Sequence, residues 1–200
     1  MDKDIADFVV DYLGKRGSSY SEARLEGSKV RGFSLKNGVP QASAFDTILG
    51  VGVRFLVNGV MGFLSTNQLE KSKLKESIDR AIKVTKSAIK IKDHIEFSEE
   101  RASVDKYEVK QKINLDNVDF DEKLKLFIDA DKSIRKEKSV KIEGNFLSYS
   151  EEIIHEYYVN SDGSRIESII PKPSFYFFTS VSAKNKMIQR YWPYGGSGGY

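Results

Sequence analysis

The sequence predicts an α+β protein with a mostly antiparallel sheet, and three features of the chain support this fold class. Two Asn-Gly pairs, Asn37-Gly38 and Asn58-Gly59, each separate two strand-like runs, as expected of hairpins with type I′ turns. A long segment with a helical apolar period follows the second pair. The last third of the chain is rich in strand-like runs that do not alternate regularly with helices, which argues against a doubly wound parallel sheet.

Three segments have the apolar spacing of amphipathic helices. The first begins near Ile5 and is ended by Gly14 and Gly17. The second has Asn67 as its expected N-cap and continues to Lys92. The third is expected from about Asp119 to Lys136, with Asp119 as cap. The stripe by which the second helix would cover the sheet consists of Leu74, Ile78, Ala81, Ile82, Thr85, Ala88 and Ile89.

The predicted strands form two groups, one before the long helix and one after the third helix. The first group contains an additional strand near Tyr20–Glu26 and the hairpin arms Val30–Lys36, Val39–Phe45, Val51–Val57 and Val60–Ser65. The second group contains Ser139–Tyr149, Glu152–Val159, Arg165–Ile170, Ser174–Ser182 and Lys186–Trp192. We therefore expect a hairpin sheet covered by an N-terminal and a long central helix, followed by a second, mostly antiparallel β region with one helix.

Changes in charge divide the chain into three predicted parts. Residues 70–92 contain eight basic and three acidic residues, whereas residues 93–131 contain twelve acidic and six basic ones. We therefore expect an N-terminal α+β domain over 1–92, an acidic connector over 93–118 and a second β-rich region over 119–200 that ends in a Gly-rich loop.

Composition excludes several classes of function. The chain has no cysteine, so disulfides, thiolate nucleophiles and cysteine-ligated zinc are excluded. Its net charge of +3 is too balanced to indicate nucleic acid by itself. There is no apolar run of the roughly 18 residues that a membrane helix needs, and the first residues lack the apolar core of a signal peptide. We expect a cytoplasmic protein that does not bind membranes.

Motifs of catalysis are weak in this sequence. His155-Glu156 begins like a helical zinc motif, but Val159 stands where the second histidine is needed, and the surrounding run is typical of a strand. Ser197 lies in a glycine run without the strand-turn-helix context of a nucleophile. The Lys-rich long helix and the aromatic run 175–178 are interpreted as a solvated face and as packing. No catalytic or metal-binding residue is predicted.

Residues 50–67 (GVGVRFLVNGVMGFLSTN) carry a family resemblance. They are similar to the line "GVGVR-x-x-x-x-G-x-x-G-F-x-S-T" of the TldD/PmbA family's N-terminal domain. Residues 157–163 resemble that family's "NS-D/E-G" turn, and residues 194–200 resemble its glycine-rich segment before the catalytic half. The resemblance implies a much longer parent chain whose C-terminal domain binds zinc through a His-Glu-x-x-x-His helix. No zinc ligand is then expected in these residues.

The resemblance also implies a role and a set of partners. We expect a non-catalytic scaffold, dimerisation and substrate-guiding portion of a zinc-dependent peptidase, acting on peptide or unfolded polypeptide and pairing as a homo- or heterodimer. Main-chain binding of the peptide or partner is expected near Asn160, Asp162, Gly163, Gly198 and Gly199. The alternatives are a stand-alone peptide- or protein-binding module and, less favoured, a nucleic-acid-associated protein, which echoes the family's "modulator of DNA gyrase" label.

Overall fold

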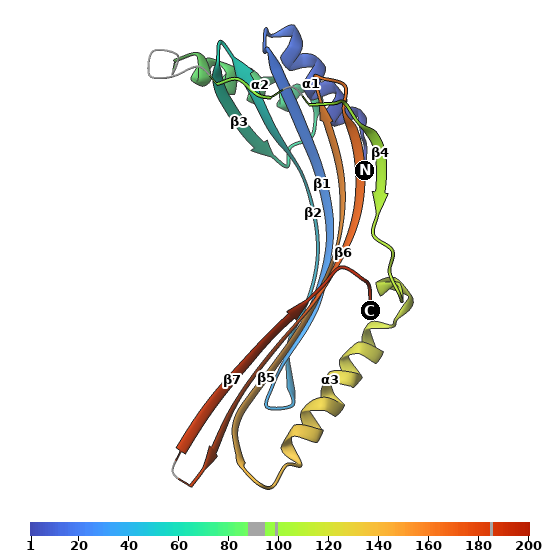
Figure 1. The fold of residues 1–200 in the computed structure, drawn as a ribbon, viewed down its shortest axis with the longest axis vertical. Coiled ribbons are helices and arrows are strands. Elements are labelled where there is room, and N and C mark those ends of the chain that lie inside the picture. Colours follow the sequence, from blue (N-terminus) through green and yellow to red (C-terminus); the bar gives the residue numbers. More distant parts are fainter. Residues whose placement is uncertain (88–94, 99, 185) are drawn as a thin grey trace. The chain divides into compact units, whose positions relative to one another are not determined.

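The computed structural model describes residues 1–87, 95–98, 100–184 and 186–200 (Figure 1). The helices are α1 (Asp4–Lys15), α2 (Lys71–Ser87), the short 3-10 helix η2 (Leu115–Asn117) and α3 (Phe120–Arg135). The strands are β1 (Tyr20–Lys36), β2 (Val39–Val57), β3 (Val60–Thr66), β4 (Val104–Glu108), β5 (Lys141–Asn160), β6 (Arg165–Ala183) and β7 (Lys186–Gly195).

The strands form one mostly antiparallel sheet, which confirms the predicted α+β class at that level. Its order is β3-β2-β1-β5-β6-β4, and β7 pairs with β6 beside this path. The pairs β2/β3 and β6/β7 are antiparallel, whereas β4 runs parallel to β6. Asn58 and Gly59, between β2 and β3, have positive φ angles of 52° and 73°. Strand β4 lies within the stretch expected to be a connector, and all five of its residues are exposed, so no apolar period marked it.

In four cases, two successive predicted strands are parts of one long strand, namely β1, β2, β5 or β6. For example, Tyr20–Glu26 and Val30–Lys36 are both parts of β1, and the two runs before and after Pro171 and Pro173 are both parts of β6. The prolines, which cannot donate a main-chain hydrogen bond, lie between the β6 residues that pair with β4 and those that pair with β7. The two prolines therefore interrupt neither the pairing of β6 with β4 nor its pairing with β7, and β6 continues through them.

The chain divides into two compact units, each assembled from three separate stretches. Unit 1 contains residues 1–28, 48–108 and 154–169, and unit 2 contains residues 29–47, 109–153 and 170–200. These units group residues by spatial proximity, whereas the predicted parts 1–92, 93–118 and 119–200 are stretches of sequence, and that linear division stays a prediction.

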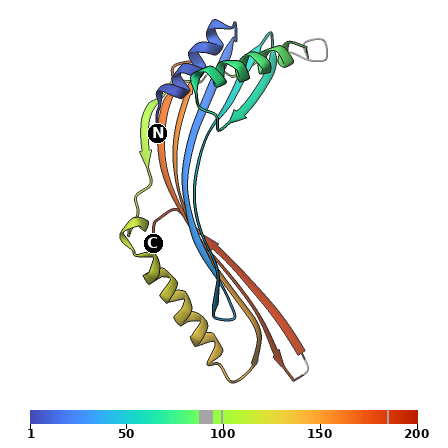
Figure 2. The ribbon, with the colours of Figure 1, turned by 180° about the vertical axis from the view of Figure 1, so that it is seen from behind.

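Helices α1 and α2 cover one face of the strands of unit 1 (Figure 2). Both helices have an apolar stripe, and alternate residues of the strands meet it. The predicted stripe residues Ala88 and Ile89 lie outside the described residues. The buried core of unit 1 comprises Ala6, Val9, Val10, Leu13, Ala23, Leu25, Val51, Val53, Phe55, Val57, Leu74, Ile78, Ile82, Tyr157 and Val159.

The core of unit 2 is aromatic and lies under α3. Phe33 of β1 is surrounded by Phe120, Phe127 and Tyr149, with ring centroids 5.4, 5.0 and 5.5 Å away. Phe175 of β6 packs edge-on against Phe127 at 5.1 Å. Such pairs favour edge-to-face geometry because the ring edge is positive and the face negative. Among the described helices of both units, none is long and apolar enough to cross a membrane.

Candidate functional site

The turn after β5 contains three of the residues predicted to bind a peptide or partner. The Asn160 side chain accepts a hydrogen bond from the Ser164 amide at 2.8 Å, and the Ser161 amide donates to the Ser21 carbonyl at 2.8 Å. Gly163 has a φ of +100°, a conformation that favours glycine. Asp162 is exposed at this turn. The turn is therefore fixed to β1 within unit 1, with the Asp162 carboxylate free to reach solvent.

Asp162 lines a cavity of about 680 Å³ in unit 1. The rings of Tyr20 and Phe97 form an aromatic part of its wall, with centroids 4.8 Å apart. The charged residues described in its lining are Glu96, Glu100 and Asp162. The cavity is thus negatively charged with an aromatic wall.

A polar network centred on Glu22 lies beside this cavity, on strands β1, β2 and β5. Glu22 accepts hydrogen bonds from Tyr20 at 2.6 Å and from Tyr158 at 3.1 Å, and it pairs with Arg54 Nε at 2.9 Å. Burial acts to raise the pKa of Glu22, but the hydrogen bonds from Arg54, Tyr20 and Tyr158 hold that pKa below its ordinary value. Burial and the bond to Glu22 raise the pKa of Tyr20, so its hydroxyl remains a donor.

The other two predicted residues, Gly198 and Gly199, belong to unit 2. The Gly198 carbonyl accepts from the Lys112 amide at 2.8 Å, and the Tyr200 amide donates to the Ile113 carbonyl at 2.9 Å. Gly199 has a φ of +90°, and a side chain there would overlap the Ile113 carbonyl. The glycine segment therefore lies closely against residues 111–113.

Next to the glycine segment, unit 2 has a cavity of about 500 Å³. Aromatic residues dominate its lining: Phe127, Tyr149, Phe175, Tyr194 and Tyr200. Lys112 and the bare backbone of Gly196, Gly198 and Gly199 complete one side. Apolar walls with few polar groups are typical of ligand pockets.

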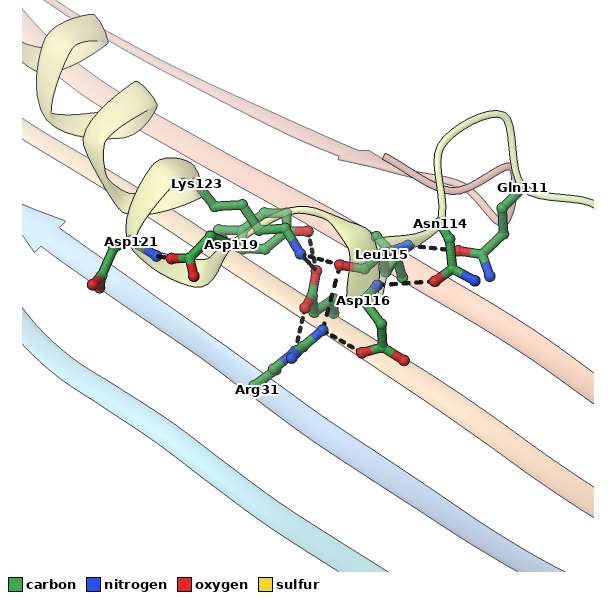
Figure 3. A network of polar contacts seen from close by, with 10 residues as sticks. Arg31, Gln111, Asn114, Leu115, Asp116, Asp119, Asp121 and Lys123 are labelled. Carbon is green, nitrogen blue, oxygen red and sulfur yellow. Dashed lines mark hydrogen bonds and ion pairs between the residues drawn. The ribbon is translucent and has the colours of Figure 1, made fainter.

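Two of these aromatic residues contact a buried charged network. Figure 3 shows the part of this network around Lys123, Leu115 and Arg31. The Lys123 ammonium, fully buried, donates to Glu151 Oε2 and to the Leu115 carbonyl, both at 2.7 Å. The Tyr149 hydroxyl donates to the same carboxylate oxygen. Lys123 also lies 5.6 Å from the Tyr200 ring centroid and 6.0 Å from that of Tyr149. The network therefore holds the Tyr149 hydroxyl by a hydrogen bond and places the Lys123 ammonium within cation–π distance of the Tyr200 ring.

Arg31 completes the network from β1. Its Nε pairs with Glu151 Oε1, and its terminal nitrogen pairs with Asp116 at 2.7 Å. Helix η2 presents Asp116, because the Asn114 side chain caps the Asp116 amide at 2.9 Å (Figure 3). Two cations and two carboxylates thus neutralise one another, and both oxygens of Glu151 are occupied. The arrangement is suited to holding structure rather than to transferring a proton.

No sequence motif indicated this network, although its residues lie within the apolar periods of α3 and β5. Lys123 lies three residues after Phe120 and four before Phe127, on the buried face of α3. Glu151 continues the alternation of Leu147 and Tyr149 along β5. The signal that could have indicated the network was a charged residue at an expected apolar position, Lys123 in α3 and Glu151 in β5.

The described residues do not fit a zinc site. Among them, there is no group of three or more His, Cys, Asp or Glu side chains that could hold a metal ion. His155 is exposed on β5, and the adjacent Glu156 bonds Arg24 at 3.3 Å. His94 lies outside the described residues.

Comparisons with known proteins extend over nearly the whole chain. The family model described as PmbA/TldA metallopeptidase domain 1 matches residues 21–85, and the one described as the PmbA/TldA metallopeptidase central domain matches residues 113–200. A curated metalloprotease of Methanocaldococcus jannaschii is 28% identical over 171 residues, which cover 85% of this chain and 37% of that protein.

Solved structures share the fold. A putative modulator of DNA gyrase from Bacteroides thetaiotaomicron has a TM-score of 0.77 at 18% identity and covers 97% of this chain and 44% of its own. A second such protein, from Thermotoga maritima, has a TM-score of 0.73 at 16% identity, covering 98% and 44%. TldE from Thermococcus kodakarensis has a TM-score of 0.68 at 16% identity, covering 94% and 42%. The chain thus spans less than half the length of each of these proteins.

Proposed function

Because the chain belongs to the PmbA/TldD metallopeptidase family, we propose that it forms the non-catalytic scaffold, dimerisation and substrate-guiding portion of a zinc-dependent peptidase. The observation that carries this proposal is that the matched metallopeptidase domains are domain 1 and the central domain, in a chain whose match covers 37% of the curated metalloprotease. Two such domains would position a polypeptide for a catalytic domain elsewhere in a longer protein.

In this proposal the substrate is a peptide or an unfolded polypeptide, and the working assembly is a cytoplasmic homo- or heterodimer. The sheet supports the substrate assignment, because extended peptides add to strand edges through main-chain hydrogen bonds. Strand β7 has exposed residues along its whole length, and the turn after β5 exposes Asp162 between the half-buried Asn160 and Gly163. Zinc, when present in the whole protein, would activate water for peptide hydrolysis from a domain other than the two matched here.

A comparison of the whole protein with residues 1–200 tests the proposal. Hydrolysis of a quenched fluorogenic peptide and zinc content by mass spectrometry are measured for both, with and without a chelator. We expect chelator-sensitive hydrolysis and about one zinc per chain only for the whole protein. Stoichiometric zinc or chelator-sensitive cleavage by residues 1–200 would overturn the non-catalytic assignment. Light scattering of the same samples tests dimerisation, and a purely monomeric whole protein would contradict that part.

A stand-alone peptide- or protein-binding module is the second candidate, and the aromatic cavity of unit 2 favours it. Residues 1–200 would then bind a peptide with the same affinity whether or not a catalytic domain is present. A nucleic-acid-associated role has the weaker support of α2, in which six basic residues accompany two acidic ones. It requires duplex DNA binding that falls steeply with salt, and an absence of binding at low salt eliminates it.

A further inference from the structure

We propose that the aromatic cavity of unit 2 binds the C-terminal residue of an extended peptide. An aromatic or branched aliphatic side chain occupies the cavity, and the free carboxylate faces Lys112. The inference rests on the proposed substrate-guiding function and specifies which end, and which kind of residue, of a polypeptide this portion recognises.

The walls of the cavity account for the apolar side chain. Phe127 and Tyr149 are only 9% and 5% exposed, so they form a buried floor, and Phe175 packs on the same core. Tyr194 is 71% exposed and forms an open side wall. A volume of about 500 Å³ lies within the range of roughly 300–1,000 Å³ that is usual for ligand pockets. Covering Tyr194 and the floor removes apolar surface from water, which favours binding.

The glycine backbone accounts for the approach of a peptide main chain. Side chains added at Gly196 or Gly198 would meet no atom within 4 Å, so open space lies beside both residues. Glycine allows another backbone to come close because no Cβ intervenes. The contacts of Gly198 and Tyr200 with residues 112–113 hold this segment in place, so the open side is formed before a peptide arrives.

Charge accounts for the selection of a free C-terminus. Of the described residues that line the cavity, Lys112 is the one with a basic side chain. Its backbone is fixed through the Gly198 carbonyl, which places the base of the side chain at the glycine segment. The Ser174 hydroxyl is already engaged with Ser150 at 2.7 Å. An ammonium beside an apolar cavity favours a carboxylate over a neutral amide.

The buried network provides rigidity. Because Lys123 and Glu151 hold Tyr149 and lie behind Tyr200, two rings of the wall keep their positions without a ligand. A preformed wall lowers the ordering cost of binding.

The test uses residues 1–200 with a chelator present and a peptide labelled with fluorescein at its N-terminus, Gly-Ser-Gly-Ser-Leu-Phe. The peptide is prepared as a free acid and as a C-terminal amide, and binding is followed by fluorescence anisotropy. We expect the acid to bind about fivefold more tightly than the amide, as for a solvent-accessible ion pair. Equal binding of the two forms, or no binding of either form, would overturn the proposal.

Two matched pairs of variants locate the site. Tyr194→Ala should weaken binding of the acid at least about fivefold through loss of aromatic contact. Tyr191→Ala is its control, because Tyr191 is similarly exposed at 67% but projects from the opposite face of β7. Lys112→Gln should make acid and amide bind alike, whereas Lys110→Gln should keep the preference. Equal effects within either pair would refute this location.

The two proposals fail in distinguishable ways. Peptide binding is measured without metal on residues 1–200, whereas the peptidase role is measured by hydrolysis with the whole protein. Selective binding together with an inactive whole protein would support the stand-alone module. Hydrolysis by the whole protein without selective binding here would remove the cavity proposal alone.

Discussion

Replacing Lys123 with methionine should destabilise unit 2 strongly. The variant keeps most of the apolar stem but removes the ammonium that donates to Glu151 and to the Leu115 carbonyl. Breaking a buried ion pair by removing one partner costs about 3–5 kcal/mol, because the other charge stays buried. Arg31 and Tyr149 still contact the Glu151 carboxylate, so we expect the lower end of that range, about 3 kcal/mol.

Urea unfolding followed by circular dichroism measures this loss. With a slope of roughly 2–3 kcal/mol per molar urea, the midpoint should fall by about 1 M or more. Lys125→Met is the control, since Lys125 is exposed on the same helix, and its midpoint should barely change. Adding Glu151→Gln to Lys123→Met should recover part of the loss, because Arg31 would then face one carboxylate, that of Asp116, instead of two. A Lys123→Met midpoint equal to that of Lys125→Met would refute the reasoning.

Two further predictions concern unit 1. The folded-state pKa of Glu22 is depressed by Arg54 and the tyrosines despite its burial, so its stabilising contribution is present at neutral pH and is lost as pH falls through that pKa. Glu22→Gln should therefore flatten the fall in stability below about pH 5, measured by urea unfolding at a series of pH values, and unchanged acid profiles would contradict this. Gly62→Ala should cost about 1–3 kcal/mol, because its methyl group would overlap the ring of Phe55, whereas Gly14→Ala in α1 meets no atom within 4 Å and should stabilise by about 0.5–1 kcal/mol. Thermal unfolding measures both variants, and a midpoint of Gly62→Ala that does not fall would contradict the close packing of β3 against Phe55 of β2.

Local signals in the sequence were sufficient for the fold class and for the first and third helices. The predicted N-cap Asn67 of the second helix is wrong, because residues 68–70 are not helical and α2 begins at Lys71. The apolar period from Ile5 predicted α1, and the structure places that helix at Asp4–Lys15. Asp119 was predicted as the cap of the third helix, and its side chain accepts from the Asp121 amide at 2.7 Å. Both features depend on residues within one or two helical turns, which a single sequence displays.

Long-range partners determined what the sequence did not predict. Prolines usually end a strand. Pro171 and Pro173 are accommodated within β6 because β4 pairs with the residues before them and β7 pairs with the residues after them. Similarly, Lys123 and Glu151 are 28 residues apart, and no local pattern indicates that the two charges meet. The cavities depend in the same way on rings from several elements, so the sequence indicated none of the aromatic residues beside Gly198 and Gly199. A binding role of these two glycines stays a prediction.

The long strands make the two cores sensitive to changes in chain length. In β1, Leu25 belongs to the core of unit 1 and Leu35 to that of unit 2, and in β5, Tyr149 and Val159 are divided in the same way. Each pair is separated by an even number of residues, in keeping with the two-residue alternation of a strand. One residue inserted between the members of a pair would turn the side chains of one core to the opposite face of the strand. Two inserted residues would keep them on their original face. Tolerance to insertions in these strands should therefore alternate between odd and even lengths, and unfolding midpoints of variants with one to four residues inserted within 27–31 would test this alternation.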